Sequence, residues 1–249
     1  MKKLILLLLF LQVGILYAEA KTPLTGTEIL ERIDKNYEAK TKVSEVTMII
    51  KGARGIRTLT SKSWGEGTDK TFIHYLSPSR DKDTKMLKLG KELWIWTPST
   101  DRIIKIAGHM LRQSMMGSDI SYEDFMEDTK FSDFYNVTVE GEEKILERQC
   151  YILELTSKPD KTPAYHSRKI WVDKEWFLPL KEELFARGGK LLKKLTIDEV
   201  FRVKERWYPK KMTFKDVLMS GDGTQIIFDT LDFDVEIPDY IFSKASLKK

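Results

Sequence analysis

Apolar and polar residues alternate with a period of two through most of this chain, in short runs that turn signals interrupt. In the run 44–50, Val46, Met48 and Ile50 share one face, because successive side chains of a strand point to opposite faces. Turn segments rich in glycine, proline, serine or aspartate follow such runs, and short strands separated in this way pair as antiparallel hairpins. The pattern predicts about a dozen strands: 44–50, 56–64, 70–76, 82–89, 92–96, 102–106, 136–139, 143–156, 166–172, 178–186, 191–203, 207–218 and 224–235.

Two segments carry helical signals instead of alternation. Thr25 and Glu28 have the spacing of a capping box, and apolar residues follow them at helical intervals. The second segment, 107–128, shows no strand pattern and has a helix start at Ser121. We call this segment the central insert. The apolar face of the first helix is expected to consist of Ile29, Leu30, Ile33 and Tyr37.

These elements together predict the fold class. Successive hairpins in one chain tend to form a strongly curved sheet or a barrel, and an apolar concave face needs a cover. Only the N-terminal helix and the central insert are available to cover it. We therefore expect a mainly β (α+β) protein: an incomplete, highly curved antiparallel β-barrel with an N-terminal helix and a central helical lid over an apolar cavity.

The first 20 residues have the pattern of a cleavable signal peptide. A basic start precedes an apolar run, 4–17, that Gln12 interrupts, and this run is shorter than the roughly 20 residues that a membrane span needs. Ala18 and Ala20 are the small residues expected at the cleavage site. No cysteine lies near the cut, so we expect a secreted protein without a lipid anchor. Residues 21–249 are expected to form a single domain.

Composition and motifs argue against several functions. The formal net charge of +4 is too small to indicate a nucleic-acid-binding protein. The three histidines lack metal-ligand spacing, and the motifs of the nucleophile elbow, the zinc proteases and the phosphate loop are missing. The acidic stretch 119–128 has neither the glycine nor the glutamate of a calcium loop, so we expect it to face water beside a capped helix. We therefore expect no enzyme, cofactor or metal site, and we expect the lone Cys150 to be a buried core residue.

Aromatic and methionine side chains are the candidates for a ligand site. Trp94 and Trp96 lie two residues apart and share one face of a strand, although alternation does not tell which face. Methionines of the central insert are flexible and suit an apolar binding surface. The alternative is that both sets fill the core of the sheet. The predicted ligand-binding residues are Trp64, Phe72, Trp94, Trp96, Met110, Leu111, Met115, Met116 and Trp171.

Two segments resemble a known family. The segment 90–98, Gly-Lys-Glu-Leu-Trp-Ile-Trp-Thr-Pro, with 101–105 after it, resembles the LolA/LolB-like lipoprotein carriers of the bacterial periplasm, as does the order of elements over the whole mature chain. The segment 116–125, Met-Gly-Ser-Asp-Ile-Ser-Tyr-Glu-Asp-Phe, resembles a subgroup of outer-membrane lipoprotein-sorting proteins associated with RND/MMPL or ABC exporters. The resemblance implies an incomplete barrel with a lid, an apolar cavity, and transport of acylated cargo without catalysis. LolA holds its lid with an arginine in the third-strand region, but the stretch 68–72 has none, so no latch residue is assigned.

The leading hypothesis is a periplasmic carrier that binds acyl chains of lipids or lipoproteins and shuttles them between membranes or to an export partner. A covered groove has a physical rationale, since an acyl chain in water costs about 0.8 kcal/mol per exposed CH₂. The alternative is a non-catalytic module with the same fold that senses envelope lipids and regulates a partner. Expected partners are acyl chains and an RND/MMPL or ABC transporter of the inner membrane, with no nucleic acid, and the protein is expected to be a monomer. The central insert is either a moving lid or a fixed plug.

Overall fold

The computed structural model describes residues 23–53, 55–127 and 130–249. The predicted signal peptide and its cut after Ala20 lie outside these residues. Within the described ranges, no helix combines the length and the apolar character needed to cross a membrane.

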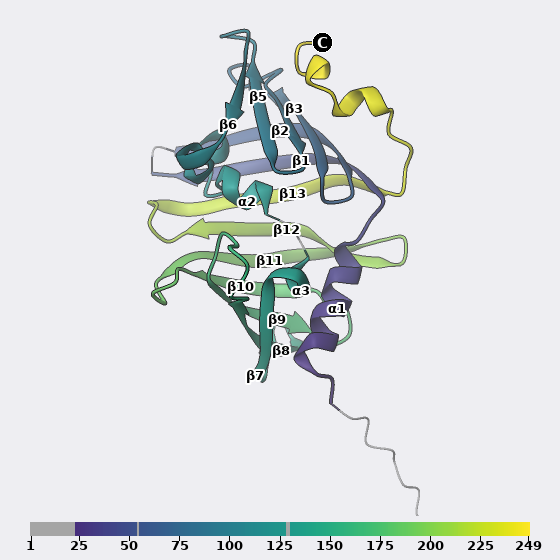
Figure 1. Cartoon of the computed structure of the whole chain (residues 1–249), viewed down its shortest axis with the longest axis vertical. Coiled ribbons are helices and arrows are strands. Elements are labelled where there is room, and N and C mark those ends of the chain that lie inside the picture. The colour runs from purple at the N-terminus through teal and green to yellow at the C-terminus, as the bar shows by residue number, and fades with distance from the viewer. Residues whose placement is uncertain (1–22, 54, 128–129) are drawn as a thin grey trace, which may run out of the picture.

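Thirteen strands of the described chain form one antiparallel sheet (Figure 1). Its order follows the chain from β1 to β6 on one side and from β13 back to β7 on the other, and the two series join where β1 pairs with β13. β6 and β7 are the two edges, so the sheet is not closed and the predicted incomplete barrel is confirmed. The strands are β1 (Thr41–Gly52), β2 (Gly55–Glu66), β3 (Lys70–Ser77), β4 (Lys85–Leu89), β5 (Glu92–Thr97), β6 (Arg102–Ile106), β7 (Tyr135–Ile145), β8 (Arg148–Ser157), β9 (Ser167–Asp173), β10 (Pro179–Phe185), β11 (Leu191–Val203), β12 (Arg206–Asp216) and β13 (Gly221–Phe233).

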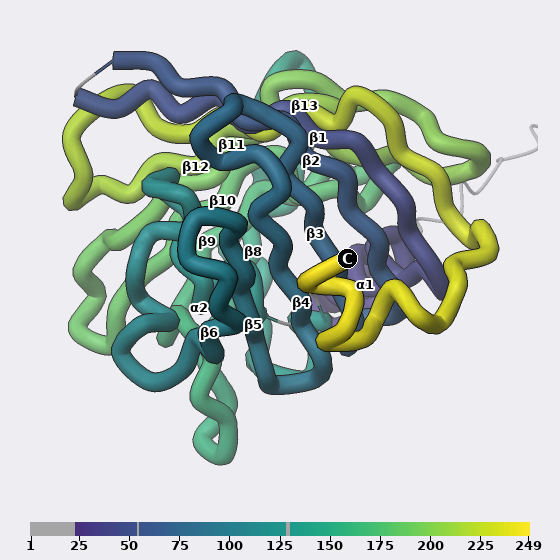
Figure 2. Tube along the Cα trace, turned by 90° about the horizontal axis from the view of Figure 1, so that it is seen from above, coloured from purple at the N-terminus to yellow at the C-terminus, as the bar shows by residue number. Residues whose placement is uncertain are grey.

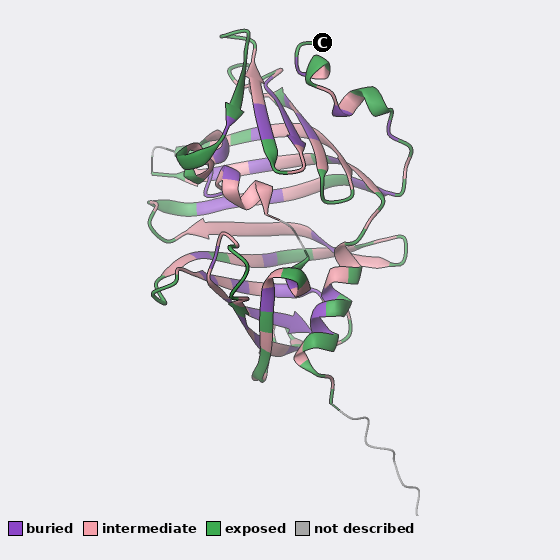
Figure 3. Cartoon of the chain, in the orientation of Figure 1, coloured by how far each residue is buried: buried purple, intermediate pink, exposed green. Residues whose placement is uncertain are grey.

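Alternating side chains give the sheet two faces of different composition. Ile73 of β3 lies opposite Met86 of β4, and both pack against the central insert on the face that we call the inner face. The neighbouring residues point the other way, to the outer face, where Phe72 lies opposite Leu87 and Leu87 lies opposite Trp94. Figure 3 shows buried residues along the strands, interspersed with intermediate and exposed ones.

Helix α1 (Gly26–Tyr37) covers the inner face at the end of the sheet formed by β7, β8 and β9 (Figure 1). The predicted capping box is confirmed: Thr25 accepts a hydrogen bond from the Glu28 amide, and the Glu28 carboxylate accepts one from the Thr25 amide. Ile29, Leu30 and Ile33 are buried, as the helical spacing predicts. They pack against Leu153, Leu155, Ile170 and Val172.

The central insert covers the inner face of the other half of the sheet. It consists of two 3₁₀ helices, η1 (Gly108–Arg112) and η2 (Met115–Gly117), followed by α2 (Tyr122–Met126). Ser121 caps α2, as the sequence predicts, and Asp124 completes a second capping box there. A further short helix, α3 (Phe131–Phe134), leads into β7, and the Asp34 carboxylate of α1 accepts hydrogen bonds from its first two amides.

The C-terminal segment lies on the outer face. It contains η3 (Asp239–Phe242) and η4 (Lys244–Leu247), which contact β3 and β4 respectively. Figure 2 shows this segment beside the same strands, on the side away from the central insert. Ile237, Phe242 and Leu247 are its buried anchors. The sheet is therefore covered on both faces over β3, β4 and β5.

One predicted strand is divided in the structure. The predicted run 143–156 contains the turn between β7 and β8, where Leu146 and Glu147 have φ angles of 48° and 60°. β7 instead continues back to Tyr135 through a register shift between Val139 and Gly141. Cys150 in β8 is a free, fully buried residue, as predicted, and burial raises the pKa of its thiol to about 11.

Candidate functional site

The inner face beneath the central insert is a continuous apolar surface. Met115, Ile120 and Tyr122 of the insert are buried on it, and Met110, Leu111, Met116, Phe125 and Met126 pack at its margin. Four of these eight side chains are methionines, which adapt their shape to different apolar neighbours. The sheet contributes the buried residues Met48, Ile50, Leu59, Ile73, Tyr75, Met86, Leu93, Ile106 and Ile226.

A buried ion pair holds α2 to the sheet. Lys193 of β11, whose side chain is 8% exposed, donates hydrogen bonds to the Asp124 carboxylate and, at 2.9 Å, to the Asp119 carbonyl. Tyr165 also donates its hydroxyl proton to Asp124. Burial opposes the charge of Asp124, but Lys193 beside it holds the pKa of Asp124 below its usual value.

Asp119 is held in a similar way. It is 5% exposed, and its carboxylate accepts hydrogen bonds from the Thr224 hydroxyl at 2.8 Å and from the Asp216 amide at 3.0 Å. The expectation that the acidic stretch 119–128 faces water is therefore wrong for Asp119 and Asp124. Their partners lie in strands about 70 to 105 residues further along the chain, which local sequence cannot reveal.

A second charged cluster lies where the end of the insert meets β9 and β10. The guanidinium of Arg168, only 5% exposed, pairs with the carboxylate of Glu127 and, at 3.2 Å, with that of Glu182. Its Nε donates to the Tyr135 hydroxyl at 3.1 Å. Burial disfavours the charge on Arg168, but the two carboxylates raise its pKa above the ordinary value. Burial also raises the pKa of Glu182, against the opposing effect of Arg168.

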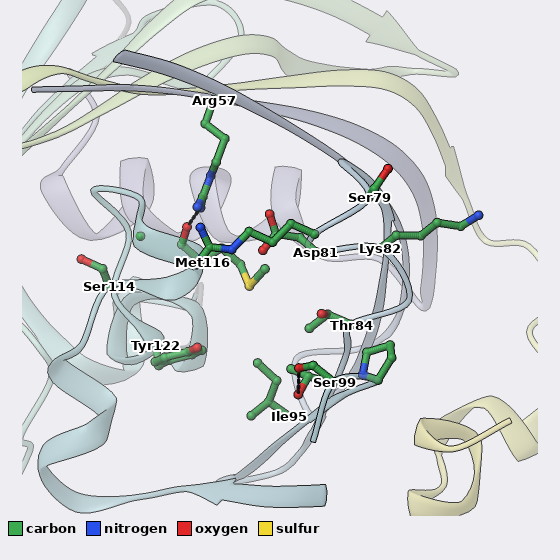
Figure 4. Close-up of a pocket in the computed structure, with 14 residues that line it drawn as sticks. Arg57, Ser79, Asp81, Lys82, Thr84, Ile95, Ser99, Ser114, Met116 and Tyr122 are labelled. Carbon is green, nitrogen blue, oxygen red and sulfur yellow. Dashed lines mark hydrogen bonds between the residues drawn. The ribbon is translucent and has the colours of Figure 1, made fainter. Parts of the chain in front are cut away.

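Arg57 of β2 contacts the middle of the insert (Figure 4). It donates a hydrogen bond from Nη2 to the Met116 carbonyl, where Met116 and Gly117 have left-handed φ angles of 54° and 74°. Beside this contact lies a cavity of about 630 Å³, which we call the Arg57 cavity. Its walls are Arg57, Ser79, Arg80, Asp81, Lys82, Thr84, Ile95, Thr97, Pro98, Ser99, Ser114, Met116, Gly117 and Tyr122.

A second cavity, of about 790 Å³, opens between the end of α1, the turn between β2 and β3, and the end of α2. Its lining mixes both signs of charge, with Tyr37 and Phe125 as its large apolar side chains. Several charges are already engaged: Glu66 pairs with Lys70 at 2.7 Å, and Lys42 donates to a tyrosine hydroxyl at 3.3 Å. Both cavities therefore lie at the margins of the insert, while the apolar surface itself is filled by insert side chains.

The structure divides the predicted ligand-binding residues into three groups. Met110, Leu111, Met115 and Met116 come together under the insert on the inner face. Trp64, Phe72, Trp94 and Trp96 gather on the outer face, under the C-terminal segment. Trp171 lies apart in β9, where its indole donates to Glu143 at 2.5 Å and its ring faces the Lys181 ammonium at 3.8 Å. The binding role of every one of these residues stays a prediction.

Sequence reasoning missed the charged residues that hold the insert, although a signal for them exists. Arg57 shares the parity of the buried Leu59, Arg168 that of Ile170, and Lys193 that of Ile197. A charged residue at the apolar phase of a strand needs a buried partner. Here the insert supplies that partner in all three cases.

Comparison with known proteins identifies the fold. A DUF1329 family protein from Desulfovibrio piger is 26% identical, with a TM-score of 0.82 over 89% of this chain and 97% of the other. A putative outer membrane lipoprotein-sorting protein domain from Vibrio parahaemolyticus is 24% identical, with a TM-score of 0.79 over 90% and 98%. A LolA superfamily protein from Nitrosomonas europaea is 22% identical, with a TM-score of 0.73 over 90% and 100%. The predicted LolA-like fold is thus confirmed.

The sequence also matches proteins described only as uncharacterized. A protein of Methanocaldococcus jannaschii is 26% identical over 183 residues, which are 73% of this chain and 51% of the other, so the chain spans about half the length of the curated relative that it matches. A family model described as "Uncharacterized protein" matches residues 67–249. Because this match covers well over half of the sequence, the chain belongs to that family, and its fold is that of the LolA-like lipoprotein-sorting proteins.

Proposed function

We propose that the protein is a non-catalytic periplasmic carrier that binds acyl chains of lipids or lipoproteins between the inner face and the central insert. Residues 21–249 act as one such unit in this proposal. The observation that carries it is the apolar inner face, covered by an insert rich in methionine and fastened by a few polar contacts. The LolA-like fold supports a binding function of this general kind.

Magnitudes favour exchange of the insert for an acyl chain. Burial of Met115 and Ile120 stabilises the docked insert by roughly 3–6 kcal/mol together. An acyl chain with about 15 methylene groups gains about 12 kcal/mol on leaving water. One acyl chain therefore offsets the loss of these two contacts, and the remainder of its gain is set against the buried ion pairs of the insert with Lys193 and Arg168.

The four residues Met110, Leu111, Met115 and Met116 are the proposed ligand contacts on the insert, because they already touch the apolar surface. A ligand can reach the buried Phe72 and Trp94 only if the C-terminal segment moves, whereas Trp64 and Trp96 beside them are partly exposed. An export transporter of the RND/MMPL or ABC type is the proposed acceptor of the cargo, and a membrane is the other candidate.

A transfer assay tests the proposal. Purified full-length protein is incubated with donor vesicles that carry a fluorescent acyl lipid and with acceptor vesicles that lack it. The proposal expects faster appearance of the lipid in acceptor vesicles and a bound acyl species in native mass spectrometry. Absence of both would refute it.

The same assay separates the carrier from the lipid-sensing module. A sensor binds the lipid but leaves the rate of transfer unchanged, whereas a carrier raises this rate in proportion to its concentration. The fixed-plug alternative for the insert predicts neither binding nor transfer by this surface.

A further inference from the structure

The Arg57 cavity combines cationic side chains with a direct boundary to the apolar inner face. Arg57, Arg80 and Lys82 line it, together with one carboxylate, Asp81, which gives three positive charges against one negative charge. Hydroxyl groups of serine and threonine occupy much of the remaining wall. Such a mixture of cations and hydroxyls suits an anionic oxygen ligand.

These cations differ from the other basic groups around the insert. Arg168 and Lys193 are each paired with carboxylates. In contrast, none of Arg57, Arg80 and Lys82 forms an ion pair with another residue in the described part of the chain. The cavity therefore carries a net positive charge, to which the partly buried Arg57 and the exposed Arg80 and Lys82 contribute.

Arg57 has an unused donor there. Its Nε is buried and, among the described residues, has no hydrogen-bond partner, while its Nη2 donates to the Met116 carbonyl. A buried donor without a partner lowers stability, and an arriving anion would satisfy it with a charge-assisted bond. In Figure 4 the Arg57 side chain extends from β2 into the space between the sheet and the insert.

The backbone of the insert forms a left-handed turn beside this guanidinium. Gly117 has a φ of 74°, and a Cβ there would lie 3.5 Å from Nη2 of Arg57. Met116 adopts a left-handed conformation at a φ of 54°, which is costly for a residue with a side chain. The carbonyl that meets Arg57 thus belongs to a left-handed turn of the insert.

The cavity also touches the apolar surface. Ile95, Met116 and Tyr122 line the cavity and belong to the cluster that packs under the insert. An amphiphile with its acyl chains on the inner face would therefore place its headgroup among Arg57, Arg80 and Lys82. The volume of about 630 Å³ lies within the usual range of small-ligand sites.

Asp81 narrows the choice of headgroup. Its Oδ2 is buried and has no hydrogen-bond partner among the described residues. A headgroup that carries only negative charge would be repelled by this oxygen, whereas an ammonium or hydroxyl group would donate to it.

We propose that the Arg57 cavity is the headgroup subsite of the carrier, and that it takes a phosphate ester which also bears a hydrogen-bond donor. This inference rests on the proposed acyl-chain function and adds the class of lipid that the protein prefers. The phosphate lies against Arg57 and Arg80, and the donor lies against Asp81.

Binding of two soluble lipids with the same chains tests the subsite. Dioctanoyl phosphatidylethanolamine and dioctanoylglycerol are titrated into the full-length protein by calorimetry, with glycerophosphate as the ligand without chains. We expect the phospholipid to bind most tightly. Arg57→Gln and Arg80→Gln should each lower its affinity about 10- to 100-fold, as loss of a charge-assisted bond does, and Arg80→Gln, which does not touch the insert fastening, should leave binding of dioctanoylglycerol unchanged. Arg102→Gln, at an exposed arginine of β6 outside the cavity, is the matched control.

Each outcome decides a different point. Equal binding of both lipids, insensitive to Arg57→Gln and Arg80→Gln, would overturn the subsite and leave the carrier function standing. Arg57→Gln could also lower the affinity for both lipids equally while Arg80→Gln lowers neither. That result would overturn the subsite, because Arg57 would then act by holding the insert and not by binding a headgroup. Glycerophosphate binding as tight as that of the phospholipid would make the cavity a site for free anions. Failure of wild-type protein to bind either lipid would refute the carrier function itself, and the subsite with it.

The Asp81 part of the proposal has its own test. Wild-type protein should prefer the ethanolamine headgroup to choline, which has no donor, and Asp81→Asn should remove this preference. An unchanged preference in Asp81→Asn would exclude the carboxylate from headgroup recognition.

Discussion

Replacement of Arg168 by methionine tests whether the buried charge cluster holds the fold and the insert together. The guanidinium is 5% exposed and lies 3.2 Å from a carboxylate of Glu182 that is 8% exposed, so its removal leaves a buried charge without compensation. Loss of one partner of such a pair costs about 3–5 kcal/mol of unfolding free energy. With a urea m-value of about 3 kcal/mol/M, the midpoint of unfolding should fall by about 1–2 M.

The loss should depend on pH. Burial raises the pKa of Glu182 above its ordinary value, and Arg168 opposes that rise, so Arg168→Met raises the pKa further. A carboxyl whose pKa is higher in the folded than in the unfolded protein binds more protons in the folded state. Its contribution to the free energy of unfolding therefore increases as the pH falls toward the pKa of the unfolded state, about 4.3. The difference in unfolding free energy between wild type and Arg168→Met should be larger at pH 7.5 than at pH 5.5.

Urea unfolding followed by far-ultraviolet circular dichroism at the two pH values measures both effects. The matched control is Arg168→Met combined with Glu182→Gln, which removes the uncompensated charge and should recover part of the lost stability at pH 7.5. The reasoning is refuted if Arg168→Met loses the same unfolding free energy at both pH values and if Glu182→Gln does not reduce that loss.

Three further predictions concern the insert, a helix cap and a turn. Met110→Asp with Met115→Asp should reduce uptake of a fluorescent acyl probe with the β-sheet dichroism retained if the insert is a lid, whereas simultaneous loss of the sheet signal would indicate a plug. Thr25→Ala removes the acceptor of the α1 capping box and should cost about 1 kcal/mol in thermal unfolding; an unchanged midpoint would contradict that contribution. Gly223→Ala should destabilise by at least about 2 kcal/mol, because its φ is 95° and a Cβ would lie 2.4 Å from a carbonyl oxygen of β12. Gly188→Ala is the control, because a Cβ at Gly188 would lie in open space, and its effect on stability should be nearly zero. Equal effects of the two substitutions would show that the chain shifts to remove the close contact at Gly223, which contradicts the prediction.

Local signals in the sequence account for most of the secondary structure. The predicted strands 102–106 and 191–203 have the observed bounds of β6 and β11, because turn residues end the alternation on both sides. The capping box at Thr25 and the helix start at Ser121 also form as predicted. The turn at Leu146 and Glu147 escaped prediction, since neither residue favours the left-handed conformation that it adopts there.

The site was less accessible to sequence reasoning, because long-range packing determines it. Alternation placed Trp94 and Trp96 on one face, but only the C-terminal segment shows that this face is the outer one. The acidic residues of the insert have the pattern of a solvated helix start. In the structure, Asp124 is instead buried in an ion pair with Lys193 of β11.

Among the described residues, the open sheet leaves one row of backbone groups along β6 and another along β7 without a partner strand. Another copy of the chain can pair with such a row and start aggregation. A protein that stays monomeric at high concentration therefore needs features that disfavour this pairing. β7 carries two exposed glutamates, Glu140 within the register shift between Val139 and Gly141 and Glu142 just after it, so an incoming copy would meet like charge and an irregular edge. β6 is short, and its five residues Arg102–Ile106 offer few backbone groups for pairing. The two ends of the same sheet thus resist aggregation by different means, and an insertion that lengthened β6 would remove the protection at that end.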